Sequence, residues 1–265
     1  MPPEGTLGAL TNTAFDRAAA LQSRTSELEA QADSMPPAPS LFSALRADHV
    51  GLIAEVKRAS PSRGAIHLGL DAATQASAYR RGGAAAISVL TEPDRFGGSD
   101  DDIAAAAKAT LLPILRKDFH VSPSQLYQAR CLGASAALLI ARALEPGLFL
   151  WLFEAAKAVD LEIVVEVRNI AELDRALAAG ARIIGVNNRN LETLVIEHGT
   201  VEALIPRIPR GVVAIAESGY EDRAGIERAA SSGADAVLVG SFLSAAADPA
   251  TEVQRLAGVL RVSRG

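Results

Sequence analysis

Polar residues that could do chemistry directly follow, or interrupt, short apolar runs of this chain. Lysines and glutamates gathered in an apolar mouth suit general acid and base catalysis, because burial and mutual pairing move their pKa values toward neutrality. Asparagine, arginine and serine can orient a substrate, and glycine-containing turns can bind a phosphate through backbone N–H groups. The candidates are Glu55, Lys57, Lys117, Glu166, Asn187, Arg189, Glu217, Ser218, Gly219, Gly240 and Ser241.

Each of these residues taken alone has an ordinary structural explanation. A lysine after a strand is usually solvated, a glutamate can pair with a neighbour, and Gly219 or Gly240 can simply form a tight turn. The whole set is harder to explain by stability, since desolvating charges costs free energy unless a ligand or a partner compensates. Convergence of these residues on one ligand site is therefore the better interpretation.

The elements that must position these residues are short apolar runs, which alternate with amphipathic stretches from residue 50 onward. Runs that are apolar throughout are typical of parallel strands buried on both faces. Eight such units in unbroken series favour a closed (β/α)8 barrel of the α/β class, and the GxGxxG turn of many open sheets is absent. The predicted strands are 51–56, 84–89, 111–115, 134–140, 162–167, 182–186, 211–216 and 235–240.

A barrel of this kind places its active site at the carboxyl ends of the strands, where the polar residues converge. The loops after the seventh and eighth strands, ESGY and GSF, are the expected phosphate site. Residues 1–47 form a helical leader broken at MPPAPS, so we expect an N-terminal helical extension packed on a barrel of residues 48–265. The helices before four of the strands are predicted to end at Gly83, Gly133, Gly180 and Gly233.

Composition argues against several classes of protein. A net charge of −5 with scattered basic residues speaks against a nucleic-acid surface. No apolar run reaches the roughly 18 residues of a membrane span, and the first residues lack a secretory signal, so we expect a cytoplasmic protein with a small-molecule ligand.

The cysteine and histidines are expected to have no role in the chemistry. Cys131 lies in a helical context, where a small buried side chain is expected. The histidines show no metal-ligand spacing, so no metal is expected, and His120 is assigned to the surface. The four histidines are His49, His67, His120 and His198.

Several segments resemble motifs of the indole-3-glycerol-phosphate synthase family, in that family's order and spacing. KRASPSRG and GVNNRNL are specific to it, whereas the ESG and VGS loops occur in other phosphate-binding barrels. The segments that carry the resemblance are IAEVKRASPSRG (53–64), LTEPDRFGGS (90–99), LRKDF (115–119), ALLIA (137–141), VEV (165–167), IGVNNRNL (184–191), AESGY (216–220) and VLVGSFL (237–243).

The resemblance implies a carboxy-lyase of tryptophan biosynthesis that needs no cofactor. Its reaction closes the ring of 1-(2-carboxyphenylamino)-1-deoxyribulose 5-phosphate, with loss of carbon dioxide and water, to give indole-3-glycerol phosphate. By resemblance, Lys117 is the acid of ring closure, while Lys57 and Glu166 serve the dehydration and Lys57 also attracts the substrate carboxylate. The division of proton transfers between Lys57 and Glu166 stays open.

The resemblance also implies roles for the other candidates. Glu55, Asn187, Arg189 and Glu217 would orient the substrate and hold the working charge states, with Ser218 as a further substrate contact. The phosphate would be bound by Ser60, Gly219, Gly240 and Ser241. The anthranilate ring would be lined by Pro61, Phe96, Phe119, Leu138 and Leu191, an apolar wall that strengthens the buried electrostatics. The SPSRG loop would be a flexible lid.

Other functions stay open at this point. A phosphoribosylanthranilate isomerase or a tryptophan synthase α subunit would also be a phosphate-binding barrel, but no cysteine ends a strand here, as an isomerase of that kind would require. A catalytically silent phosphosugar-binding barrel is disfavoured because both Lys117 and Glu166 are present. The leader and the stretch LVIEHGTVEAL depart from the family pattern and leave room for a specialised duplicate copy. We expect a monomer, with a weak dimer as the alternative.

Overall fold

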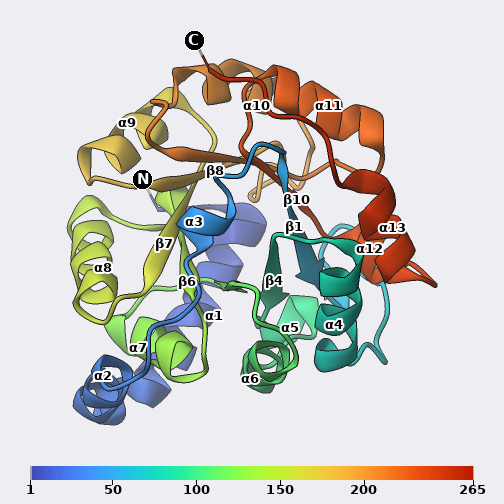
Figure 1. Ribbon diagram of the computed structural model, residues 1–265. Coiled ribbons are helices and arrows are strands. Elements are labelled where there is room, and N and C mark those ends of the chain that lie inside the picture. The colour runs from blue at the N-terminus through green and yellow to red at the C-terminus, as the bar shows by residue number, and fades with distance from the viewer. Residues whose placement is uncertain (1, 265) are drawn as a thin grey trace.

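The computed structural model describes residues 2–264, and within them eight parallel strands close into a barrel (Figure 1). Each strand pairs with the next along the chain, and the last pairs with the first, with Gly51 opposite Ala236. The predicted (β/α)8 barrel is therefore confirmed. The barrel strands are β1 (Gly51–Val56), β4 (Ala86–Leu90), β5 (Ile114–Lys117), β6 (Ala136–Ile140), β7 (Glu162–Val167), β8 (Ile183–Asn187), β9 (Val213–Glu217) and β10 (Ala236–Val239).

The predicted strand positions agree with these bounds except for shifts at their ends, which are largest in β5. The prediction that Leu111 and Leu112 belong to this strand was wrong: Leu111 is 84% exposed, and the N–H of Leu112 donates to the Thr110 hydroxyl in a turn. Pro113 has no N–H to donate to a strand ladder, so pairing begins after it. Arg116 and Lys117 consequently lie inside β5 rather than after it.

Helices ring the outside of the barrel (Figure 1). The four glycines predicted to end helices all have positive φ, between 81° and 94°, which confirms those helix ends. The longer helices around the barrel are α4 (Ala72–Gly82), α6 (Asp100–Ala109), α7 (Pro123–Cys131), α8 (Pro146–Ala158), α9 (Ile170–Ala178), α10 (Gly199–Leu204), α11 (Arg223–Ser231) and α13 (Pro249–Leu256). Shorter elements are α3 (Leu41–Ala44), β2 (Ala59–Ser60), β3 (Gly64–Ala65), α5 (Pro93–Phe96), η2 (Ala141–Ala143), η3 (Ile205–Arg207) and α12 (Ser241–Ser244).

The leader forms the predicted helical extension, with α1 (Gly5–Leu21), η1 (Gln22–Arg24) and α2 (Thr25–Asp33). Helix α2 packs on α7, where Tyr127 donates a hydrogen bond to Glu29 and the half-buried Cys131 thiol contacts the Leu28 carbonyl. Helix α1 is tied to the carboxyl ends of the strands, because Arg17 binds Asp118, directly after β5, at 2.8 Å. No helix within residues 2–264 is both long and apolar enough to cross a lipid bilayer.

The opposite end of the barrel is held by the C-terminal segment. The Arg264 guanidinium is buried and donates to Asp235, just before β10, at 2.8 Å, and to the carbonyls of Gly233 and Val212 at 2.6 Å each. The same carboxylate accepts the N–H of Ala214 in β9 and pairs with Arg261. A buried cation with this many partners links the end of the chain to two barrel strands.

Replacing Asp235 with alanine should lower the free energy of unfolding by about 3 to 5 kcal/mol, because the Arg264 guanidinium then stays buried without its counter-charge. The measurement is urea unfolding followed by circular dichroism. Glu154→Ala, which removes an exposed pair with Lys157 on α8, is the control and should change stability by less than about 0.5 kcal/mol. Equal changes in the free energy of unfolding for the two variants would contradict a stabilising role of the buried Arg264–Asp235 pair.

Candidate active site

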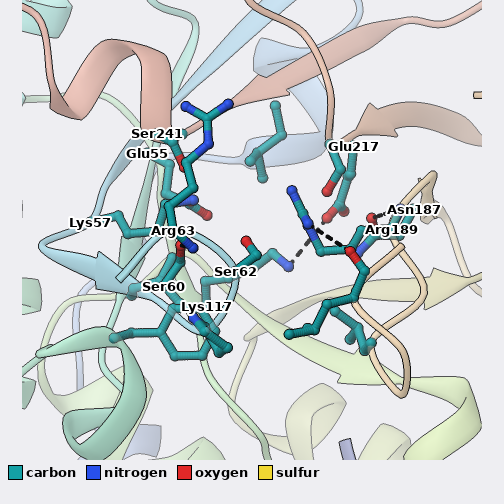
Figure 2. A pocket seen from close by; sticks show the side chains of 18 of the residues that line it. Glu55, Lys57, Ser60, Ser62, Arg63, Lys117, Asn187, Arg189, Glu217 and Ser241 are labelled. Carbon is teal, nitrogen blue, oxygen red and sulfur yellow. Dashed lines mark hydrogen bonds and ion pairs between the residues drawn. The ribbon is translucent and has the colours of Figure 1, made fainter. Parts of the chain in front are cut away.

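One pocket opens at the carboxyl ends of the barrel strands. Figure 2 shows Asn187, Arg189 and Glu217 on one side of it and Lys57 and Ser241 on the other. Every predicted site residue lines this pocket except Glu166, which is buried behind Lys117. Lining residues that the sequence did not indicate include Thr6 and Leu10 of α1, Glu221 and Phe242.

Lys117 lies between two buried carboxylates. Its ammonium nitrogen is 3.0 Å from Glu166 Oε2 and 3.2 Å from Glu217 Oε2, and both glutamate side chains are 2% exposed. Burial by itself would lower the pKa of Lys117, but the charges of Glu166, Glu217 and Glu55 outweigh it and raise the pKa above its ordinary value. Lys117 is therefore a charged proton donor in a site largely removed from water.

Glu217 is the carboxyl group of this cluster whose protonation is most perturbed. Burial raises its pKa from 4.5 to about 7, with Lys117 opposing the rise and Glu166 adding to it. Its Oε1 atom is buried without a hydrogen-bond partner and lies over Gly185, where an added Cβ would be only 2.1 Å from it. Glu217 can thus exchange a proton near neutral pH.

A second ion pair lies beside the first. Lys57 Nζ is 2.7 Å from Glu55 Oε1, so Lys57 contacts Glu55 and Lys117 contacts Glu166. A Cβ at Gly240 would lie 2.2 Å from that Glu55 oxygen and 2.6 Å from Lys57 Nζ. Gly240 therefore makes room for the Lys57–Glu55 pair, a reason for glycine that is independent of any phosphate.

Four ionisable side chains form one layer inside the barrel. Glu55, Lys117, Glu166 and Glu217 come from β1, β5, β7 and β9, which are alternate strands of the closed sheet. Interior layers of such barrels are built from four alternate strands and are normally apolar. In this layer, burial raises the pKa of Glu217, while Glu166 pairs with Lys117 and Glu55 pairs with Lys57 beside the layer.

The mouth of the pocket carries arginines and an apolar wall. The backbone N–H of Arg189 donates to Asn187 Oδ1 at 2.8 Å, and Arg63 pairs with Glu221 across the mouth. The rings of Phe96 and Phe119 lie 6.5 Å apart at the wall. An apolar lining beside charged groups lowers the local dielectric and strengthens their interactions with a ligand.

Glu92 fixes the position of one of these rings. Its buried carboxylate accepts the backbone N–H groups of Asp94, Arg95 and Phe96, which caps the short helix α5. The sequence does not reveal this role of Glu92, since a glutamate before Pro93 has no signature of its own beyond the helix start.

The surface position predicted for His120 was wrong. The side chain is buried, its Nδ1 donates to the Leu138 carbonyl at 2.8 Å, and burial lowers its pKa to about 4. His120 is not among the residues that line the pocket. Within residues 2–264 no group of three or more His, Cys, Asp and Glu side chains is arranged to hold a metal ion.

Comparisons with known proteins agree with this architecture. Two solved barrels share the fold at low sequence identity. One is 3-hexulose-6-phosphate synthase from Salmonella typhimurium, with a TM-score of 0.62 and 18% identity, which covers 78% of this chain and 96% of that chain. The other is thiamine phosphate pyrophosphorylase from Pyrococcus furiosus, with a TM-score of 0.61 and 16% identity, which covers 82% of this chain and 96% of that chain. At these identities the likeness shows the fold alone.

Sequence comparison is more specific. The family model described as indole-3-glycerol phosphate synthase matches residues 11–256. The curated relatives include the indole-3-glycerol phosphate synthase of Mycobacterium sp. (strain KMS), 47% identical over 87% of this chain and 85% of that protein, and indole-3-glycerol phosphate synthase 1 of Streptomyces coelicolor, 46% identical over 87% and 86%. This chain belongs to the indole-3-glycerol phosphate synthase family.

Proposed function

We infer that this chain converts 1-(2-carboxyphenylamino)-1-deoxyribulose 5-phosphate to indole-3-glycerol phosphate, the carboxy-lyase step of tryptophan biosynthesis. Family membership carries the reaction, and one observation of the site carries the mechanism: a charged lysine held between two buried carboxyl groups beside an apolar wall. The residue roles that follow are our proposal.

In the first step, Lys117 protonates the substrate carbonyl oxygen while the aromatic carbon attacks the carbonyl carbon. The Lys117 proton goes to the new hydroxyl group, and Glu166 and Glu217 stabilise the charged lysine before transfer. Lys57 attracts the substrate carboxylate, whose loss as carbon dioxide leaves an electron pair that restores the aromatic ring. Glu55 holds Lys57 in place at 2.7 Å.

In the second step, one of Lys57 and Glu166 protonates the new hydroxyl group, which leaves as water, and the other accepts the proton of the neighbouring ring carbon as the ring double bond forms. Asn187 and Arg189 orient the substrate, supported by the hydrogen bond between them. Glu217, with a pKa of about 7, holds or releases the proton that balances the cluster between the two steps. Ser218 is a further substrate contact.

The two ends of the substrate fit the two sides of the pocket. Phe96, Phe119, Leu138, Leu191 and Pro61 line the anthranilate ring. Ser60, Gly219, Gly240 and Ser241 bind the phosphate through hydroxyl and backbone N–H groups, at the position where barrels of this class usually hold one. The segment 60–64, with the Arg63–Glu221 contact, acts as the lid.

We also propose the setting in which this site works. Residues 1–47 form the extension and residues 48–265 the catalytic barrel, acting in the cytoplasm as a monomer or weak dimer. The phosphorylated substrate is the only ligand that the mechanism requires, and no nucleic acid, membrane or cofactor takes part.

Replacing Lys117 with alanine should lower kcat by roughly 10²- to 10⁴-fold, because ring closure loses its acid. Product is measured by indole absorbance and fluorescence with the substrate supplied without metal or cofactor. Lys157→Ala, at a lysine that is 75% exposed on α8, is the matched control and should behave like the parent. A parent that binds the substrate but forms no indole would instead support the silent barrel.

The stability of the protein should depend on pH through Glu217. Between its ordinary pKa of 4.5 and about 7, the folded protein holds a proton that the unfolded chain releases, so the stability of the parent falls as pH rises through this window. Glu217→Gln carries no such proton, so its Tm should rise relative to the parent from pH 5 to pH 8. For the control Glu154→Gln, the difference in Tm from the parent should not change with pH. A difference that does not change with pH for Glu217→Gln either would show that the pKa of Glu217 is not raised on folding.

A further inference from the structure

The loop after β9 has an unusual backbone. Ser218 has a φ of 69° and Gly219 a φ of 89°, so two consecutive residues lie in the left-handed region. Glycine adopts this conformation freely, but serine does so only when its surroundings hold it there. Both residues line the pocket beside Ser241. The backbone direction of this loop therefore depends on contacts made from outside the pocket.

Asn188 supplies those contacts. It directly follows β8, it is buried with 1% of the residue exposed, and it is not among the residues that line the pocket. Its amide NH₂ donates to the Ser218 carbonyl and to the Tyr220 hydroxyl, both at 3.3 Å. Its amide oxygen accepts the backbone N–H of Val201 in α10 at 3.1 Å. One buried amide therefore connects the end of β8, the loop after β9 and helix α10.

The main chain of Asn188 adds to this connection. Its N–H donates to the Glu217 carbonyl at 3.0 Å, and its carbonyl accepts the N–H of Glu197 at 2.8 Å. The side-chain amide thus acts on the residues that come directly after Glu217, while the backbone continues the β8–β9 ladder. A substitution of the Asn188 side chain therefore removes the contacts with the loop and leaves the backbone hydrogen bonds of the sheet in place.

We propose that Asn188 is a positioning residue for the phosphate end of the pocket. By holding the carbonyl of Ser218, the amide keeps the Ser218–Gly219 pair left-handed and the Gly219 backbone N–H directed at the phosphate. Successive backbone N–H groups held in such a turn form an anion-binding concavity. The inference rests on the proposed function, because it assumes that this end of the pocket takes the phosphate.

Only an amide has the hydrogen-bonding groups that this position requires. Aspartate would place a carboxylate oxygen against the Ser218 carbonyl and lose the donors, while alanine would leave the Ser218 carbonyl and the Val201 N–H without their partner. Tyr220→Phe removes the second acceptor of the NH₂ group but leaves the bond to Ser218. The effect on phosphate binding should therefore be large for Asn188→Ala and small for Tyr220→Phe.

The test measures kcat, KM and inhibition by inorganic phosphate in Asn188→Ala and the parent. Asn188→Ala should raise KM and the inhibition constant of phosphate about tenfold, the equivalent of one lost hydrogen bond at the loop, and leave kcat within about twofold. The pH profile of kcat should stay unchanged, because the lysine and glutamate cluster is not altered. If Asn188→Ala does not fold, Asn188→Ser replaces it. The serine hydroxyl is smaller and neutral, and KM and the inhibition constant of phosphate should rise less than in Asn188→Ala.

Asp235→Ala is the control for lost stability alone, since it weakens the far end of the barrel and should lower Tm without changing KM. If the Asn188 variants lower Tm but leave KM and phosphate inhibition as in the parent, the residue is only structural and the inference is overturned. A fall in kcat at constant KM would overturn it as well.

Ser241→Ala separates this inference from the proposed function. If Ser241→Ala weakens phosphate inhibition and the Asn188 variants do not, only the role of Asn188 fails. If phosphate does not compete with the substrate in the parent, the phosphate site itself is misplaced and the proposed function fails with the inference.

Discussion

The structure depends on a layer of charge inside the barrel. Glu55, Lys117, Glu166 and Glu217 occupy the uppermost interior positions of four alternate strands, where a stable barrel would ordinarily place aliphatic side chains. Burial raises the pKa of Glu217 to about 7, although the neighbouring Lys117 ammonium opposes the rise. Pairing at about 3 Å offsets the cost of burying these groups. The residues that the neighbouring strands place beside the pairs must therefore have small side chains.

Two glycines meet that requirement. Gly185 faces Glu217 and Gly240 faces the Lys57–Glu55 pair, and a methyl group at either position would overlap a carboxylate oxygen. The charged layer and the two glycines therefore form one unit, in which the position of each charged side chain limits the residue that can lie beside it. The barrel fold supplies the positions of these side chains, and the chemistry comes from charged groups in an interior layer that is normally apolar.

The sequence predicted the barrel and the polar strand ends because both follow from local patterns. Continuous apolar runs identify buried parallel strands, and polar residues at their carboxyl ends must meet at one mouth. Which lysine pairs with which glutamate could not be predicted, since it depends on strand register around the closed sheet. Thr6 and Leu10 were missed because nothing in the leader shows where α1 docks. The sequence places Asn188 at a strand end beside Asn187 and Arg189, which predicts that it faces the mouth, but its side chain does not line the pocket.

The position of α1 has a consequence for how the protein folds. Helix α1 and the residue that caps it lie far from their anchors in the sequence: Asp118 is 101 residues beyond Arg17, and Glu192 is 188 residues beyond Glu4. Contacts this distant in sequence form after the local ones, because closing so long a loop costs entropy before any contact compensates. Docking of α1 is therefore expected to follow the local contacts of the barrel, and with it comes the part of the pocket wall formed by Thr6 and Leu10.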